Sequence, residues 1–159
     1  MHRLPVLIVF ALAVSACGGS SSGKKTTSTV ATKPPSVQAF VTAGNNVCMA
    51  ADRRIVKLGR LTRNPKGWAQ TAAEARQAIH EMEKITPPPS RAKAFKSMLR
   101  YARALTLSIQ EVHDSLVKND IDTAAAAQFA AAQIQDRVHT AAKTAGLTFC
   151  QQALTNWPA

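Results

Sequence analysis

The histidine and carboxylate residues of this chain lack the spacing that catalytic and metal sites require. His80, His113 and His139 fall in three separate stretches, and the Glu-x-x-His pairs of di-iron bundles do not occur. The sequence also contains no Cys-x-x-Cys-His haem attachment, glycine-rich phosphate loop or nucleophile elbow. Glu81 and Glu83 lie on successive faces of a predicted helix, so they do not form the pair of carboxylates in an apolar pocket that acid–base catalysis needs. We therefore expect no enzyme activity, no metal and no resident cofactor.

The first 16 residues have the composition of a secretory signal. A basic start at 1–3 precedes nine apolar residues at 6–14, and such a run is about half the length of a membrane-spanning helix. The next residues, Val14-Ser15-Ala16-Cys17, resemble the lipobox of bacterial lipoproteins. The resemblance implies cleavage before Cys17, a lipid thioether on its sulfur and acylation of the new N-terminus. The alternative is an ordinary signal with a chance cysteine, which the position of Cys17 disfavours.

A polar linker at 17–35 follows the signal. Its glycines, serines, threonines and lysines bury too little apolar surface to order themselves. From Cys17 to Ser36 a flexible coil reaches roughly 24 Å. We expect a domain at 36–159 that is held by this tether at the outer, extracytoplasmic face of the cell membrane.

Two cysteines remain once Cys17 is assigned to the lipid by this resemblance. An even number of cysteines in an exported protein indicates a disulfide, here between Cys48 and Cys150. The alternatives are two buried thiols or two ligands of a metal. A zinc site is disfavoured because no histidine stands near either cysteine.

The domain reads as four amphipathic helices. Alanine is abundant and glycine scarce, and apolar residues recur at steps of three and four. The predicted helices run from Ser36 to about Arg60, from Asn64 to the prolines at 87–89, from Ser90 to Lys118, and from Asp120 or Asp122 to Ala145, with Gly146 as the C-cap.

Four helices with short connections predict an all-α, up-down-up-down four-helix bundle behind the flexible tether. An even number of antiparallel helices places the start of the first and the end of the fourth at one end of the molecule. Cys48 and Cys150 would then be neighbours, which agrees with the predicted disulfide.

The chain is strongly basic. Arg3 is the one basic residue of the first 16, so the remainder carries 19 Lys and Arg against 9 Asp and Glu. Lys93, Lys96, Arg100 and Arg103 recur at steps of three and four and share one solvent-facing side of the third helix. We expect this basic stripe to bind anionic lipid or a cell-wall polymer. Export argues against nucleic acid, and the alternative is a solvated face without a partner.

Several short motifs resemble those of small actinobacterial lipoproteins and secreted helical proteins of unknown function. They are Phe40-Val41, Asn45-Asn46-Val47-Cys48, the prolines in mid-domain, Asp122 before an alanine run, and Gly146-Leu147-Thr148-Phe149-Cys150. The resemblance implies a two-cysteine helical domain and transfers no activity.

The resulting prediction is a non-enzymatic binding or scaffold module of the cell envelope, attached to the membrane by lipid, with an unidentified protein partner. The alternative is a carrier of a small ligand or haem in the bundle interior, with Met49 and His139 as haem ligands, although methionine beside a helix seam usually fills the core. A pocket lined by polar groups would favour the carrier, and a continuously apolar interior the scaffold.

Overall fold

The structure, a computed structural model, describes residues 35–61 and 63–153. Within these residues the chain forms five helices and no strand, which confirms the predicted all-α fold. The helices are α1 (Val37–Val56), α2 (Pro65–Glu83), α3 (Pro89–Val117), α4 (Ile121–Ala145) and α5 (Thr148–Ala153). The predicted signal, Cys17 and nearly all of the linker lie outside the described residues.

Side-chain caps fix the starts of three helices. Ser36 accepts a hydrogen bond from the Ala39 amide at 3.1 Å, before α1. Asn64 accepts one from the Gly67 amide at 3.2 Å before α2, and the corresponding bond from Thr123 to Asp120 before α4 is 3.0 Å. Each bond satisfies an amide that the first helical turn leaves without a partner. These are the starts that the sequence predicts.

Three predicted boundaries were wrong. Helix α2 ends at Glu83 and not at the prolines at 87–89, because the Lys84 and Ile85 amides bond to carbonyls three residues back instead of four. Helix α3 begins at Pro89, one residue before the predicted Ser90, with Pro88 at the cap position. The fixed φ of proline suits the first helical position, so Pro89 joins the helix. Helix α1 ends at Val56 and not near Arg60, because the chain turns there and Gly59 takes a φ of 70°.

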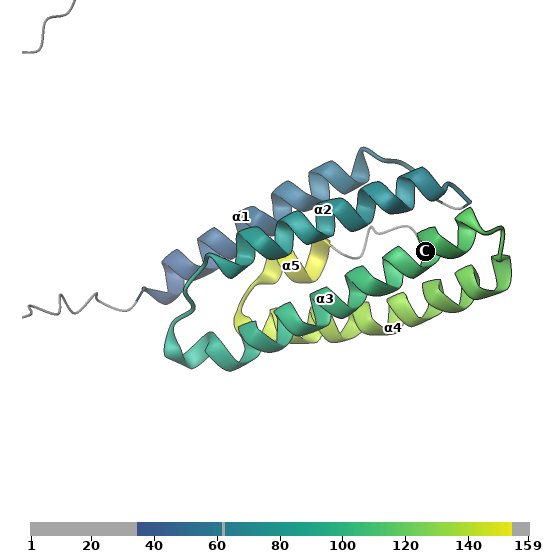
Figure 1. Ribbon diagram of the computed structural model, residues 1–159. Helices are drawn as coiled ribbons and strands as arrows, with labels where there is room; N and C mark the ends of the chain where they lie inside the picture. Colours follow the sequence, from purple (N-terminus) through teal and green to yellow (C-terminus); the bar gives the residue numbers. More distant parts are fainter. Residues whose placement is uncertain (1–34, 62, 154–159) are drawn as a thin grey trace, which may run out of the picture. The chain divides into compact units, whose positions relative to one another are not determined.

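The four long helices run alternately up and down (Figure 1). Helix α1 packs on α2, α2 on α3 and α3 on α4. The α3–α4 contact is the most extensive. Buried small residues, namely Ser108 and Ser115 of α3 and the alanines of α4, allow these two helices to approach closely.

The short helix α5, which the sequence analysis did not predict, packs against both α1 and α4. Three contacts hold its start against α1. The side chain of Leu147 packs over Gly44, where an added Cβ would lie 2.7 Å from Leu147 Cδ2. The Phe149 amide donates to Asn45 Oδ1 at 3.1 Å, and Cys150 is joined to Cys48 by a disulfide with a Cα–Cα distance of 5.1 Å.

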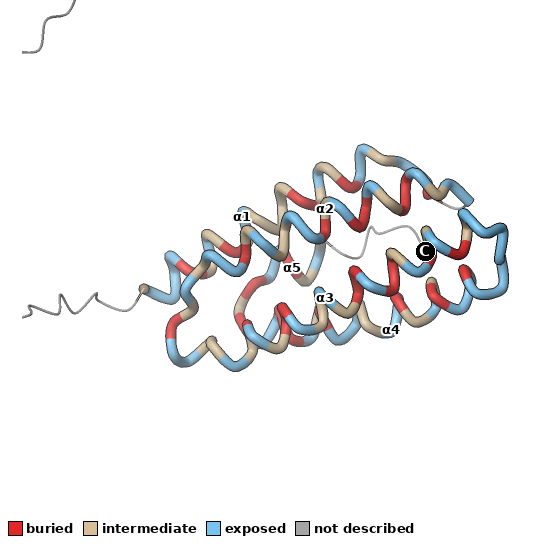
Figure 2. The backbone as a smooth tube through the Cα atoms, viewed as in Figure 1, coloured by how far each residue is buried: buried red, intermediate tan, exposed pale blue. Residues whose placement is uncertain are grey.

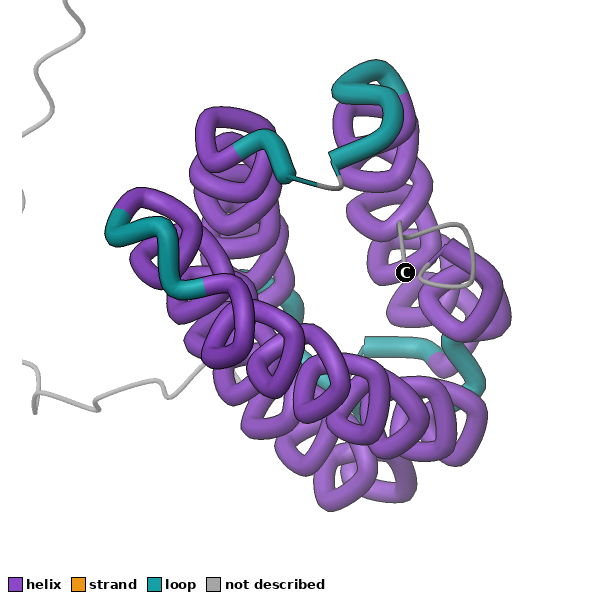
Figure 3. Tube along the Cα trace, turned by 90° about the vertical axis from the view of Figure 1, so that its right-hand side faces the viewer, coloured by secondary structure: helices purple, strands orange, loops and turns teal. Residues whose placement is uncertain are grey.

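The core follows the inward faces of the helices, which Figure 2 shows as buried positions along each tube. Phe40 of α1 meets Phe95 of α3 edge to face, with ring centroids 5.2 Å apart. Short connections join the helix ends (Figure 3). None of the described helices combines the length and the apolar character that crossing a membrane requires.

Candidate functional site

An apolar groove runs into the bundle between α1, α2 and α3. Helix α4 contributes Val138 to its wall and α5 contributes Cys150. The groove has a volume of about 80 Å³. It is partly open, because Asp52, Ala78 and Ala102 in its lining are only half-buried.

The groove exists because small side chains face one another across three helices. Ala51, Ala75, Ala78 and Ala102 line it, and larger residues at these positions would fill the space. Met82 and Met98 are almost fully buried and form part of its wall. Methionine is flexible and polarisable, so such a wall can adapt to ligands of differing shape.

One charged residue, Asp52, belongs to this lining. Its Oδ1 atom is buried and has no hydrogen-bond partner among the described residues. Burial raises the pKa of the Asp52 carboxyl above its usual value. The groove is therefore an apolar surface with a single acidic group.

The disulfide forms part of the groove wall, since both Cys48 and Cys150 line it. Cys150 is buried and Cys48 is half-buried. The bond joins residues 102 positions apart and fixes α5 beside α1. The predicted pairing thus has a second consequence, because it closes one side of the groove.

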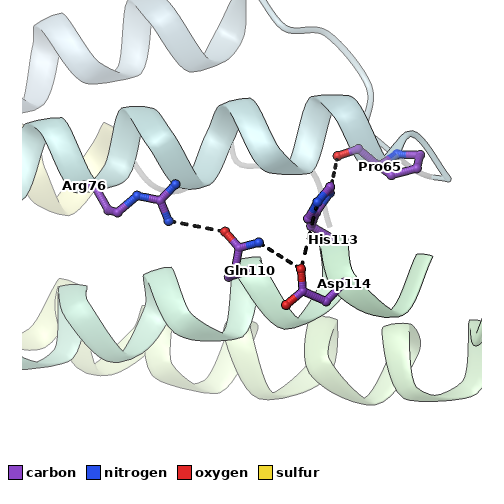
Figure 4. Close-up of polar contacts among 5 residues, drawn as sticks. All are labelled: Pro65, Arg76, Gln110, His113 and Asp114. Carbon is purple, nitrogen blue, oxygen red and sulfur yellow. Dashed lines mark hydrogen bonds and ion pairs between the residues drawn. The ribbon is translucent and has the colours of Figure 1, made fainter. Parts of the chain in front are cut away.

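His113 belongs to a polar chain that links α2 to α3 (Figure 4). Its Nδ1 donates to the Pro65 carbonyl at 2.9 Å, and its Nε2 lies 3.9 Å from the Asp114 carboxylate. Arg76 donates to Gln110 at 3.3 Å, and Gln110 donates to Asp114 at 2.9 Å. No hydroxyl or thiol is among the partners of His113 in the part of the chain described. These polar contacts hold α2 and α3 in register.

The other two histidines among the described residues lie apart from the groove lining. His80 is exposed, whereas His139 is half-buried with an Nε2 atom that has no partner among the described residues. Burial lowers the pKa of His139, and the nearby Asp136 opposes that shift. Within residues 35–61 and 63–153, no three His, Cys, Asp or Glu side chains come together as a metal site would require.

The predicted basic stripe on α3 is exposed along its length. Two of its four members have partners within the protein. Arg103 forms an ion pair with Glu83 of α2, and the Arg100 guanidinium lies 4.8 Å from the centroid of the Tyr101 ring and donates to its hydroxyl. Lys93 and Lys96 have no ion-pair partner among the described residues.

The groove could not be predicted from the sequence. The four alanines that line it belong to three different helices, and the periodicity of one helix does not show which residues of another helix lie opposite. Comparison of the chain with protein-family models, with curated proteins and with solved structures finds no match. The site must therefore be interpreted from its own geometry.

Proposed function

We propose that this protein is a lipid-anchored, non-enzymatic binding module of the cell envelope that takes up an apolar ligand in the groove. The lipobox-like segment and the polar linker support attachment at the outer face of the membrane. The observation that carries the binding function is the apolar groove of about 80 Å³ among α1, α2 and α3.

The groove departs from both interiors that we expected. Its wall is almost wholly apolar, as in a scaffold, yet it is partly open to solvent. An apolar ligand that fills the groove removes this wall from water, which stabilises the complex by about 25 cal/mol per Å² of apolar surface buried. Larger side chains at the lining alanines would cover the same surface without a ligand. This favours ligand binding over a purely structural role.

The size of the groove limits the ligand. A volume of about 80 Å³ holds roughly five to eight water molecules, which suits a short alkyl chain or a single ring. A tetrapyrrole is several times larger, and no histidine or Met49 is among the lining residues described. The geometry therefore favours an alkyl or aromatic group over haem.

A series of straight-chain alcohols from butanol to decanol tests this proposal by calorimetric titration of the oxidised protein. Each methylene that enters the groove contributes about 0.8 kcal/mol, which is roughly a fourfold gain in affinity. We expect affinity to rise with chain length until the groove is full and then to level off. Affinity that is unmeasurable throughout the series would contradict the proposal.

Matched substitutions on α2 assign the binding to the groove. Ala78→Leu places a larger side chain in the lining, whereas Ala73→Leu makes the same change at an exposed position outside it. We expect the first to weaken binding at least tenfold and the second to leave it unchanged, with both variants folded by circular dichroism. Equal affinities for the two variants would place the ligand elsewhere.

A further inference from the structure

The end of the bundle at which α1 begins gathers the ends of four helices. The start of α1, the end of α2, the start of α3 and the end of α4 lie together there (Figure 1). A hydrogen bond of 2.9 Å from Arg91 in the first turn of α3 to the Thr144 carbonyl near the end of α4 holds two of them side by side. The linker joins the domain at this end.

Four exposed lysines from three helices surround this end. They are Lys84 after α2, Lys93 and Lys96 in the first turns of α3, and Lys143 in the last turn of α4. None of them has an ion-pair partner among the described residues. The two carboxylates nearest to Lys84 in sequence already have partners, since Glu81 accepts from Gln77 and Glu83 pairs with Arg103.

Helix stability explains only half of this lysine set. Lys84 and Lys143 stand at helix C-termini, where the macrodipole favours cations. Lys93 and Lys96 lie in the second turn of α3, beyond the first turn in which the macrodipole acts, so it does not explain them. Neither the helix macrodipole nor an ion pair accounts for Lys93 and Lys96, and a cluster of such charges would attract an external anionic surface.

We propose that this lysine end is a docking surface for the anionic headgroups of the membrane to which the protein is tethered. The inference rests on the anchoring part of the proposed function and is independent of the groove. Ser36 follows the proposed lipid site at Cys17 by 19 residues, a span of at most about 65 Å, so the anchor would keep the lysine end near the bilayer. Each lysine at an anionic leaflet strengthens binding about fivefold before screening by salt. The surface differs from the stripe predicted on α3, because it includes Lys84 and Lys143 and excludes the paired Arg103.

Vesicle binding of the unlipidated protein tests this surface. The probe protein is the chain from residue 17 with Cys17→Ser, oxidised, mixed with phosphatidylcholine vesicles with and without phosphatidylglycerol across a salt series. We expect binding only to the anionic vesicles, weakening as salt rises. Absence of binding at low salt, or binding to an anionic cell-wall polymer alone, would overturn the proposal.

Two variants with equal charge change separate the lysine end from net charge. One replaces Lys84, Lys93, Lys96 and Lys143 by Gln. The control replaces four exposed cations at the opposite end by Gln, namely Lys57, Arg60, Arg63 and Lys66. We expect the first variant to bind at least tenfold more weakly than the control. Equal loss in both would mean that net charge alone drives binding, and the docking surface would be wrong.

Discussion

Removal of the Cys48–Cys150 disulfide should strongly destabilise the domain. The bond closes a loop between residues 102 positions apart. In the chain-entropy model a loop of that size restricts the unfolded chain by up to about 4.7 kcal/mol. For a domain of this size, such a loss lowers the Tm by about 15–20 °C. The free energy of unfolding of the double variant Cys48→Ala/Cys150→Ala should be lower by nearly this amount.

The assay is urea unfolding, followed by circular dichroism, of both proteins with and without reductant. We expect reductant to destabilise the natural protein to within about 1 kcal/mol of the double variant and to leave the double variant unchanged. Hydrogen exchange should increase most in α5, because the disulfide is one of the three contacts that hold its start on α1. A double variant as stable as the oxidised protein, or two freely alkylatable thiols in the native protein, would refute this reasoning.

Three further predictions concern single positions. Gly146→Ala should lower the free energy of unfolding by about 1–2 kcal/mol in urea titrations, because Gly146 has a φ of 81° that alanine adopts at a cost. Asp52→Asn should stabilise the protein at pH 7, because it removes a buried carboxylate charge whose burial raises the pKa of Asp52. Protonation of Asp52 removes the same charge, so the gain in free energy of unfolding should vanish in titrations below about pH 3.8. Cys17→Ala should leave the precursor uncleaved or release the protein to the soluble fraction, as fractionation and mass spectrometry would show.

The sequence predicts the four long helices well because local chemistry sets their ends. Ser36, Asn64 and Asp120 cap helices with their own side chains, and Gly146 ends α4 in a left-handed conformation. These signals act within a few residues of the boundary that they mark, so a single chain reveals them. The pairing of Cys48 with Cys150 was predicted from the even number of cysteines that remain after Cys17, and the helix count agrees with it.

Apart from the disulfide, features that depend on how distant residues pack together could not be predicted. Helix α5 has six residues, too few for a periodic pattern, and its position depends on Gly44, Asn45 and Cys48 more than 100 residues earlier. The pairing of Arg103 with Glu83 depends on the register of α2 against α3. The groove is the clearest example, because it depends on how residues of α1, α2 and α3 lie relative to one another, and the pattern of any one helix does not show this.

The most direct test of the apolar groove as a binding site is methionine methyl NMR during titration with hexanol. Met82 and Met98 line the groove, whereas Met49 of α1 is not among its lining residues. We expect saturable shifts of the Met82 and Met98 methyl signals, with the Met49 signal unmoved. Shifts of equal size at all three methionines, or none at Met82 and Met98, would contradict it.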